Sequence, residues 1–297
     1  MRDRRAALIT GGTGYVGSSL VRRLISSQWE VHVIVRAGSN LDALANVEEQ
    51  ASLHIHDGST EGLMRIMEGV KPDVVFHLAS LFLAQHTPKD VAPLIESNIT
   101  FATQLVEAMA QNKIRNLVNT GTSWQHFENK SYSPVCLYAA TKQAFEALLQ
   151  YYIEARSIKA ITLELFDTYG PHDPRPKLLH LLGKIAASGE ILAMSPGEQI
   201  LDLVYIDDVI DAYMLSAERL LGTEGEVQEH YAVSSGQPLS LKDVVARFEK
   251  VTGKKLSIQW GGRPYREREV MSPWSLGKQL PGWTAKISLE EGLRRIA

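Results

Sequence analysis

The stretch Leu8-Ile9-Thr10-Gly11-Gly12-Thr13-Gly14-Tyr15-Val16-Gly17 decides the fold of this chain. A short apolar strand, Ala6 to Ile9, leads into a glycine turn, and a helix with apolar residues at helical spacing follows. Gly11, Gly14 and Gly17 have the G-x-x-G-x-x-G spacing, which permits a tight turn and a close approach of the backbone to a pyrophosphate. The amides at the start of such a helix attract phosphate. The stretch predicts a dinucleotide-binding turn, and a plain glycine turn is the alternative.

Strands and helices alternate along the first part of the chain. Strands are expected at 6–9, 30–36, 53–56, 74–80, 116–120 and 159–165, and helices at 61–67, 92–112 and 137–155. The run Val74-Val75-Phe76-His77-Leu78-Ala79-Ser80 is almost continuously apolar, as in a strand covered on both faces. Because each crossover is long enough to join parallel strands, the pattern predicts an α/β fold with a doubly wound parallel sheet.

The regular alternation of strands and helices ends beyond Tyr169-Gly170-Pro171, where prolines interrupt the chain. Residues 1–170 are predicted to form a dinucleotide-binding Rossmann domain, and residues 171–297 a smaller, mainly substrate-binding lobe. Residues 200–235 are expected to return to the Rossmann sheet. Helices are expected at 178–187, 207–221, 243–252 and 289–296, and a strand at 230–234.

Composition narrows the class of protein. The chain has 297 residues, 44% hydrophobic and 22% charged, and its net charge of -3 favours neither nucleic acid nor an anionic membrane as a partner. The single cysteine, Cys136, excludes an internal disulfide and a multi-cysteine metal site, and no metal site is predicted. The first apolar segment is too short for a signal peptide, and no later run reaches transmembrane length. We therefore expect a cytoplasmic protein.

The end of the second expected strand bears on the choice of cofactor. A site that prefers NAD usually has an acidic residue there, bonded to the ribose 2′-OH, but this chain has Arg36. A planar guanidinium suits a 2′-phosphate, so NADP(H) is favoured and NAD(H) is the alternative; Arg36 could also be a plain surface cation. Asp57, before Gly58, suits an adenine amino group, although it could simply cap the turn.

Tyr138 and Lys142 lie four residues apart, on one face of the helix expected at 137–155. A nearby ammonium is expected to lower the pKa of the tyrosine from its ordinary ~10, so that it can act as an acid or base. Thr122 ends the preceding strand, at the sheet edge where ligands bind, and is expected to hydrogen-bond a substrate carbonyl. Thr120 and Ser123 are the alternatives for that role.

Together these motifs resemble those of the extended short-chain dehydrogenase/reductases. The branch is that of the NAD(P)-dependent nucleotide-sugar epimerases, dehydratases and reductases. The resemblance rests on the glycine stretch, His77-Leu78-Ala79-Ser80, Thr122, Tyr138-x-x-x-Lys142 and Phe166-Asp167-Thr168-Tyr169-Gly170-Pro171. Val204-Tyr205-Ile206-Asp207-Asp208-Val209 and the C-terminal Leu-Pro-Gly-Trp extend the resemblance to nearly the whole chain.

The resemblance implies a catalytic triad of Thr122, Tyr138 and Lys142. It also implies a nucleotide-sugar substrate and a homodimer formed through the helices expected at 92–112 and 137–155. From the motifs and the resemblance together, the residues expected to contact the cofactor are Gly11, Thr13, Gly14, Tyr15, Val16, Arg36, Asp57, Gly58, Leu78, Ala79, Ser80, Asn98, Thr120, Tyr138, Lys142 and Phe166.

Departures from the family pattern narrow the expected chemistry. The 4,6-dehydratases carry an Asp-Glu pair where this chain has Ser123-Trp124, so elimination of water is not expected. Leu201 replaces an arginine that binds the diphosphate in many epimerases, and Glu164 and Asp167 replace an arginine and an asparagine. The residues expected to contact the substrate are Thr122, Ser123, Asp167, Arg175, Lys177, Arg266 and Arg268, with Arg263 as a further cation.

Residues 120–142 and 165–175 are most similar to the abequose- and paratose-synthase-like reductases, which complete CDP-3,6-dideoxyhexoses. The sequence therefore predicts reduction of the 4-keto group of a nucleotide-linked deoxyhexose, with hydride from the nicotinamide and a proton from Tyr138. A 4-epimerase with tightly bound NAD is the alternative. A non-catalytic dinucleotide-sensing protein is a third interpretation, but it would not need the proton donor.

Overall fold

A seven-stranded parallel sheet forms the centre of the computed structural model, which describes residues 4–45 and 47–296. The strand order is β11-β6-β5-β4-β1-β2-β3. The strands are β1 (Ala6–Thr10), β2 (Glu30–Arg36), β3 (Ala51–His56), β4 (Val74–His77), β5 (Asn116–Thr122), β6 (Lys159–Leu165) and β11 (Gln228–Val233). Because β1 lies between β2 and β4, the order reverses there, and the carboxyl ends of these strands border a ligand-binding crevice. The predicted doubly wound sheet is confirmed.

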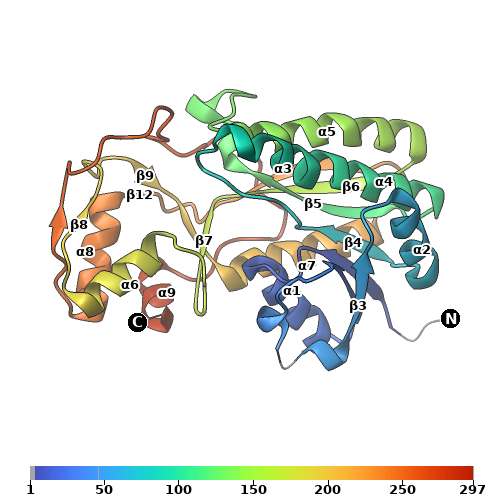
Figure 1. Cartoon of the computed structure of the whole chain (residues 1–297), viewed down its shortest axis with the longest axis horizontal. Helices are drawn as coiled ribbons and strands as arrows, with labels where there is room; N and C mark the ends of the chain where they lie inside the picture. The colour runs from blue at the N-terminus through green and yellow to red at the C-terminus, as the bar shows by residue number, and fades with distance from the viewer. Residues whose placement is uncertain (1–3, 46, 297) are drawn as a thin grey trace.

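Helices cover both faces of this sheet (Figure 1). One face carries α2 (Thr60–Val70), α4 (Phe101–Gln111) and α5 (Leu137–Arg156), and the other carries α1 (Tyr15–Ser26) and α7 (Ile206–Gly222). Leu8 and Ile9, adjacent in β1, are fully buried on opposite faces, which is why the strand sequences are continuously apolar. Among the described residues, no helix combines the length and apolarity needed to cross a bilayer.

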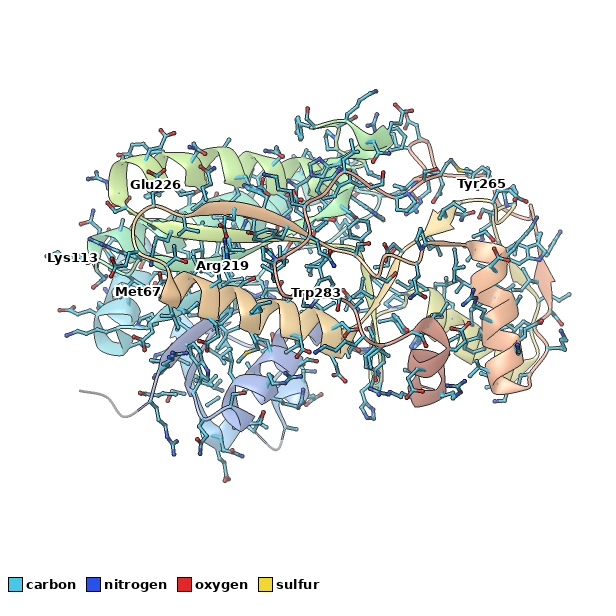
Figure 2. All side chains as sticks on the ribbon, turned by 180° about the vertical axis from the view of Figure 1, so that it is seen from behind. Met67, Lys113, Arg219, Glu226, Tyr265 and Trp283 are labelled. Carbon is cyan, nitrogen blue, oxygen red and sulfur yellow. The ribbon has the colours of Figure 1, made fainter. Side chains whose placement is uncertain are left out.

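A smaller lobe packs at the carboxyl ends of the strands (Figure 1). Its elements are α6 (Leu178–Ser188), α8 (Leu241–Thr252), α9 (Leu289–Ile296) and the strand pairs β7 (Asp167–Tyr169) with β10 (Leu203–Tyr205), β9 (Ile200–Leu201) with β12 (Leu239–Ser240), and β8 (Leu192–Ala193) with β13 (Ile258–Gln259). Trp283 ties the C-terminal segment to α7, where its indole N–H donates to the carbonyl of Asp208 at 2.9 Å (Figure 2). The domain division at residue 170 stays a prediction.

Two elements differ from the sequence-based expectation. The helix expected at 92–112 is divided into α3 (Val91–Ile95), a π-helical turn (Glu96–Thr100) and α4. The strand expected at 74–80 ends at His77, because the chain then turns toward Asn98 in the π turn. The Leu81 N–H donates to Asn98 Oδ1 at 2.7 Å, and the Leu81 carbonyl accepts from Asn98 Nδ2 at 3.0 Å. The same asparagine thus lies in one departure and is bonded to the loop that follows the other.

Candidate active site

The glycine turn after β1 is so tight that side chains would not fit in it. Gly11 has a φ of +73°, and a Cβ there would lie 2.6 Å from the backbone nitrogen of Ala79. A Cβ on Gly17 would lie 2.1 Å from the carbonyl oxygen of Gly11, so α1 packs directly on the turn. Gly14, which has no side chain to cap α1, is exposed. The turn therefore fits a dinucleotide, because its bare amides and the positive end of the helix dipole favour a pyrophosphate.

Arg36 and Asp57 lie together at the neighbouring strand ends, since Arg36 is in register with His56. Arg36 is exposed, and its backbone N–H bonds to Ser39 Oγ at 3.1 Å. Asp57 accepts hydrogen bonds from the N–H and hydroxyl of Ser59 at 2.9 and 2.6 Å, so it does cap the turn. The contacts of Arg36 with a 2′-phosphate and of Asp57 with adenine stay predictions.

A hydrogen-bonded chain leads from the π turn to Tyr138. Asn98, only 2% exposed, donates from Nδ2 to Thr141 Oγ1 at 2.9 Å and accepts from Ser80 Oγ at 3.3 Å. The Ser80 hydroxyl is also hydrogen-bonded to the phenol of Tyr138. The loop that begins at Leu78 is thereby held between the glycine turn and Tyr138. Ser80 and Asn98 were expected near the cofactor, and in the structure they also position the candidate acid.

Thr122, Tyr138 and Lys142 are all buried at the carboxyl end of the sheet. Thr122 ends β5, and the other two lie in the first turns of α5, which packs on β5. The hydroxyl oxygen of Thr122 accepts from the Trp124 N–H at 3.3 Å, so its own proton is available to a ligand. The structure thus brings the three expected catalytic residues to one end of the fold, although their catalytic roles stay predictions.

Burial decides the protonation of the two α5 residues. Burial raises the pKa of Tyr138, and the hydrogen bond with Ser80 opposes this only in part. The shift is opposite to the one expected from the spacing of Tyr138 and Lys142, because burial desolvates the phenolate. Burial also lowers the pKa of Lys142 to about 8, against the influence of Glu146. Tyr138 therefore keeps its proton at neutral pH, as a proton donor must.

A cleft of about 1160 Å³ opens between the carboxyl ends of the central strands and the C-terminal lobe. Phe82 and Trp124 form an aromatic wall in it, with ring centroids 5.6 Å apart. Phe82 packs edge-on against Tyr138 at 4.9 Å, so the candidate acid lies directly behind the wall. Lys177 lies 5.8 Å from the Phe82 ring and Arg266 5.4 Å from the Trp124 ring. The cleft is thus apolar beside Tyr138 and cationic farther out.

Two cations that line the cleft, Lys177 and Arg266, are each paired with a carboxylate. Lys177 pairs with Asp167 at 3.1 Å, and Arg266 pairs with Glu269 at 2.8 Å. All four residues line the cleft, as does the exposed Arg263. This arrangement suits a phosphate, which can replace the carboxylates as the partner of the cations.

Arg175 and Arg268 are engaged elsewhere. Arg175 makes a two-bond ion pair with Asp173, each bond 2.7 Å long, and lies 4.6 Å from the centre of the Tyr15 ring. Arg268 donates to Ser133 Oγ at 2.8 Å. Neither arginine is among the described residues that line the cleft, so their predicted substrate contacts gain no support from it.

Three further expected residues lie around the same end of the sheet. The Thr120 hydroxyl donates to a backbone carbonyl of β4 at 2.7 Å and is also bonded to the Tyr213 hydroxyl at 2.7 Å. With both partners in place, Thr120 is less available to a carbonyl than Thr122. Ser123 is buried at the start of a 3₁₀ turn, and Phe166 is stacked on Trp274 with centroids 6.4 Å apart.

Sequence reasoning missed Phe82, Gln125 and Glu146. Phe82 lies in the loop after β4, where no periodic pattern distinguishes it from its neighbours. Gln125 is completely buried in the turn after Thr122, although glutamine is normally a surface residue. Glu146 could have been found, because it follows Lys142 by one helical turn and so shares its face of α5.

Comparison with known proteins places this site in a family. Residues 7–233 match the NAD dependent epimerase/dehydratase family. The chain belongs to that family. It is 29% identical to CDP-abequose synthase of Yersinia pseudotuberculosis over 90% of both chains. It is 26% identical to CDP-abequose synthase of Salmonella muenchen, over 97% of this chain and 96% of the relative. The resemblance to extended short-chain dehydrogenase/reductases is confirmed.

Two solved structures share the fold of this chain. UDP-glucose 4-epimerase of Thermotoga maritima, solved with UDP-glucose, is 24% identical with a TM-score of 0.85, over 97% of this chain and 96% of that one. UDP-glucuronic acid 4-epimerase of Bacillus cereus was solved with UDP-glucuronic acid and NAD. It is 23% identical with a TM-score of 0.84, over 98% of this chain and 97% of that one. These likenesses show a shared Rossmann fold, and the NAD-dependent family is shown by the match of residues 7–233.

Proposed function

We propose that this enzyme reduces the 4-keto group of a nucleotide-linked deoxyhexose, of the CDP-4-keto-3,6-dideoxyhexose type, with NADPH as the favoured cofactor and NADH as the alternative. The main support for this proposal is the aromatic wall of Phe82 and Trp124, which lies beside Tyr138 and Thr122. A sugar hydroxyl pressed against such a wall would lose its water partners without replacing them. A sugar that lacks hydroxyls near the reacting carbon avoids this cost, so the wall favours a deoxyhexose.

The residues around Tyr138 have complementary roles in such a reduction. The nicotinamide supplies the hydride when the cofactor is bound. The Thr122 hydroxyl donates a hydrogen bond to the ketone oxygen, and Tyr138 transfers its proton to that oxygen as it becomes an alkoxide. Lys142, cationic below its pKa of about 8, stabilises the phenolate that remains. Elimination of water would need a further acid and base, which Ser123 and Trp124 do not supply.

The outer part of the cleft suits the nucleotide diphosphate. Lys177, Arg263 and Arg266 line it and supply positive charge beyond the aromatic wall. The similarity to two CDP-abequose synthases supports a CDP-sugar over sugars linked to other nucleotides. The protein is further proposed to be a cytoplasmic homodimer that buries exposed apolar residues of α3 and α5, which are Val91, Ile95, Leu148 and Tyr151.

A substrate screen tests this function. Purified protein is assayed for NADPH and NADH oxidation with 4-keto-6-deoxy and 4-keto-3,6-dideoxy sugars linked to CDP, dTDP, UDP or GDP. We expect the fastest oxidation with NADPH and the CDP-linked 4-keto-3,6-dideoxyhexose. A 4-epimerase would instead retain nicotinamide through purification and turn over without added NADPH. A sensor would bind the dinucleotide without turnover, and either result would overturn the reductase.

A further inference from the structure

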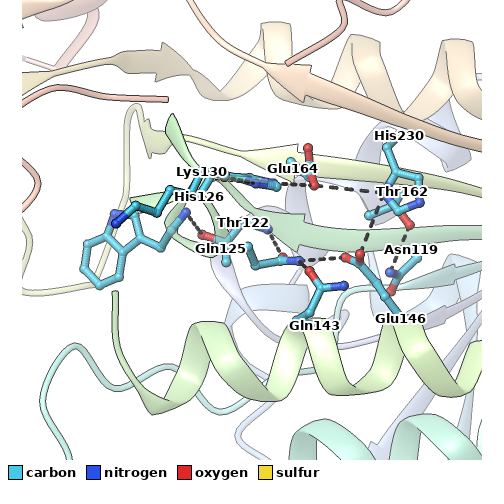
Figure 3. Close-up of polar contacts among 11 residues, drawn as sticks. Asn119, Thr122, Gln125, His126, Lys130, Gln143, Glu146, Thr162, Glu164 and His230 are labelled. Atoms are coloured by element: carbon cyan, nitrogen blue, oxygen red, sulfur yellow. Dashed lines mark hydrogen bonds and ion pairs between the residues drawn. The ribbon is translucent and has the colours of Figure 1, made fainter. Parts of the chain in front are cut away.

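A polar cluster lies between α5 and the sheet, close to Thr122 (Figure 3). Glu146 comes from α5, Glu164 from β6, His230 from β11, and His126 follows β5. His230 Nδ1 lies 3.7 Å from a carboxylate oxygen of Glu146 and 3.9 Å from one of Glu164. His126 Nε2 is hydrogen-bonded to Glu164 Oε1 at 3.0 Å. Two carboxylates and two imidazoles from four segments therefore meet in one place.

The two carboxylates need positive charge, because both are buried. Glu164 is 3% exposed and stands where the resembling family has an arginine, so a cation is replaced by an anion at that position. Burial alone would lower the pKa of His126, but its hydrogen bonds to Glu164 and to backbone carbonyls raise it. The charged form of His126 is therefore favoured beside Glu164. Its ring is also stacked on Trp274, with centroids 3.9 Å apart.

Gln125 joins this cluster to Thr122. Its Oε1 accepts the backbone N–H of Thr122 at 3.0 Å, and its Nε2 donates to Glu146 Oε1 at 3.0 Å (Figure 3). Nε2 also donates to Gln143 Oε1 at 3.0 Å. The orientation of the Gln125 amide follows from these partners, since its oxygen faces a donor and its nitrogen faces two acceptors. Thr122 is thus held by a hydrogen-bonded chain that ends on the Glu146 carboxylate.

Glu146 also acts on Lys142, one helical turn before it on the same face of α5. In the described part of the chain, the titratable groups that influence Lys142 are Glu146 and His77 on β4. Burial lowers the pKa of His77 to about 3, so this imidazole is neutral. Burial raises the pKa of Glu146, while His230 and Lys142 oppose that rise and favour its charged form. When Glu146 is charged, its carboxylate favours the ammonium form of Lys142.

We propose that Glu146 is a positioning residue of the active site, which holds Thr122 in place through Gln125 and keeps Lys142 cationic through its own charge. His126 neutralises Glu164, and His230, the half-exposed member, bridges the two carboxylates. The inference rests on the roles proposed above for Thr122 and Lys142. It adds a group, outside the expected triad, that acts on two of its members at once.

Two substitutions distinguish the effect of Glu146 on Lys142 from its effect on Thr122 through Gln125. Glu146→Gln can still accept the hydrogen bond from Gln125 but has no charge, so the alkaline fall in kcat should move to lower pH by about one unit or more. Gln125→Met leaves the charge of Glu146 in place but releases Thr122. This variant should lose about tenfold in kcat without a shift of the pH profile. Glu154→Gln, at an exposed position of the same helix, is the matched control and should change neither quantity.

A binding measurement keeps this proposal separate from the proposed reaction. Affinity for NADPH, titrated from about pH 6 to about pH 9, should follow the charge of Lys142 without turnover. Glu146→Gln should shift this binding profile in the same direction as the rate profile. If Glu146→Gln folds, as shown by its thermal melting, and shifts neither profile, the proposal is overturned even in an active reductase. If no ketone is reduced but the binding profile shifts, the proposed reaction fails and the role of Glu146 stands.

A bound metal ion would explain the same cluster differently. Ligand atoms of Glu146, Glu164 and His230 all lie within 4.8 Å of one another, as around a divalent cation. The charge balance described above needs no such ion, because Lys142 and His126 oppose the two carboxylates. We therefore expect purified protein to contain no stoichiometric metal and EDTA to leave its melting temperature unchanged. Stoichiometric zinc or manganese that EDTA removes with a loss of stability would overturn the proposal.

Discussion

The cofactor-facing and substrate-facing sides of the active site are built from different parts of the chain. On the cofactor side, backbone packs on backbone, so that a Cβ on Gly17 would lie 2.1 Å from a carbonyl oxygen. On the substrate side, the cleft is formed by long side chains such as Phe82, Trp124 and Arg266, which come from separate segments. A backbone turn tolerates no added atom, whereas a wall of side chains can be altered one residue at a time. We therefore expect changes in the glycine turn to weaken cofactor binding strongly, and changes in the side-chain wall to adjust specificity.

Tyr138 lies between the two sides, so its substitution should affect the binding of neither the cofactor nor the sugar. Tyr138→Phe removes only the hydroxyl, so affinity for NADPH and the KM for the sugar should be retained. Loss of a general acid is typically worth ~10²–10⁴-fold, and kcat should fall by about that factor. Steady-state rates with NADPH titration provide the measurement.

Two further variants sharpen the test of Tyr138. Lys142→Met should lose rate and also weaken cofactor binding, because Lys142 is expected to contact the cofactor as well as to assist Tyr138. Thr122→Val should retain its affinity for the cofactor, and its kcat should fall by less than that of Tyr138→Phe. A Tyr138→Phe enzyme that works within a few-fold of the wild type would contradict the assignment of the acid.

Gly17→Ala tests the cofactor side. The added Cβ would overlap the Gly11 carbonyl, so the turn must move. Such overpacking typically costs about 1–3 kcal/mol, and we expect a loss of stability in that range together with about a hundredfold weaker binding of NADPH. Gly69→Ala is the matched control, because Gly69 is exposed in α2 and its Cβ would meet no atom within 4 Å. Urea unfolding and cofactor titration compare the two, and equal behaviour would contradict the role of the turn.

Arg36→Asp tests a side-chain contact on the same side. Because Arg36 is exposed at the end of β2, its replacement should leave the turn intact. A 2′-phosphate would lose a cation and meet a carboxylate, so preference should move from NADPH toward NADH by about tenfold or more. The ratio of kcat/KM for the two cofactors measures this. A wild type that uses both equally, or a variant that keeps its NADPH preference, would show that Arg36 does not select the cofactor.

Arg266→Ala tests the substrate side and should have the smallest effect. A diphosphate far from C4 is bound alike in the ground and transition states, so the KM for the sugar should rise several-fold while kcat changes less. Arg268→Ala, two residues away, is the matched control, because Arg268 donates to Ser133 and lies outside the cleft lining. If Arg268→Ala raises the KM and Arg266→Ala does not, the diphosphate is bound at Arg268.

Much of the fold could be predicted from local patterns. The expected strands at 30–36 and 159–165 coincide with β2 and β6, because an apolar run between turns has few alternatives. The π turn between α3 and α4 could not be predicted, because it accompanies bonds between Asn98 and the loop after β4. Helix periodicity reports only neighbours within one or two turns. It contains no signal for a partner on another element.

The sequence by itself determined the glycine turn, the order of strands and helices, and the shared face of Tyr138 and Lys142. These features depend on residues a few positions apart, whose spacing is visible in the chain. Only the tertiary structure decided which cations line the cleft, and that burial raises the pKa of Tyr138. The meeting of Glu146 with groups from β6 and β11 was likewise decided by the folded protein. Such properties arise from segments distant in sequence and from the exclusion of water, and neither can be read from residue spacing.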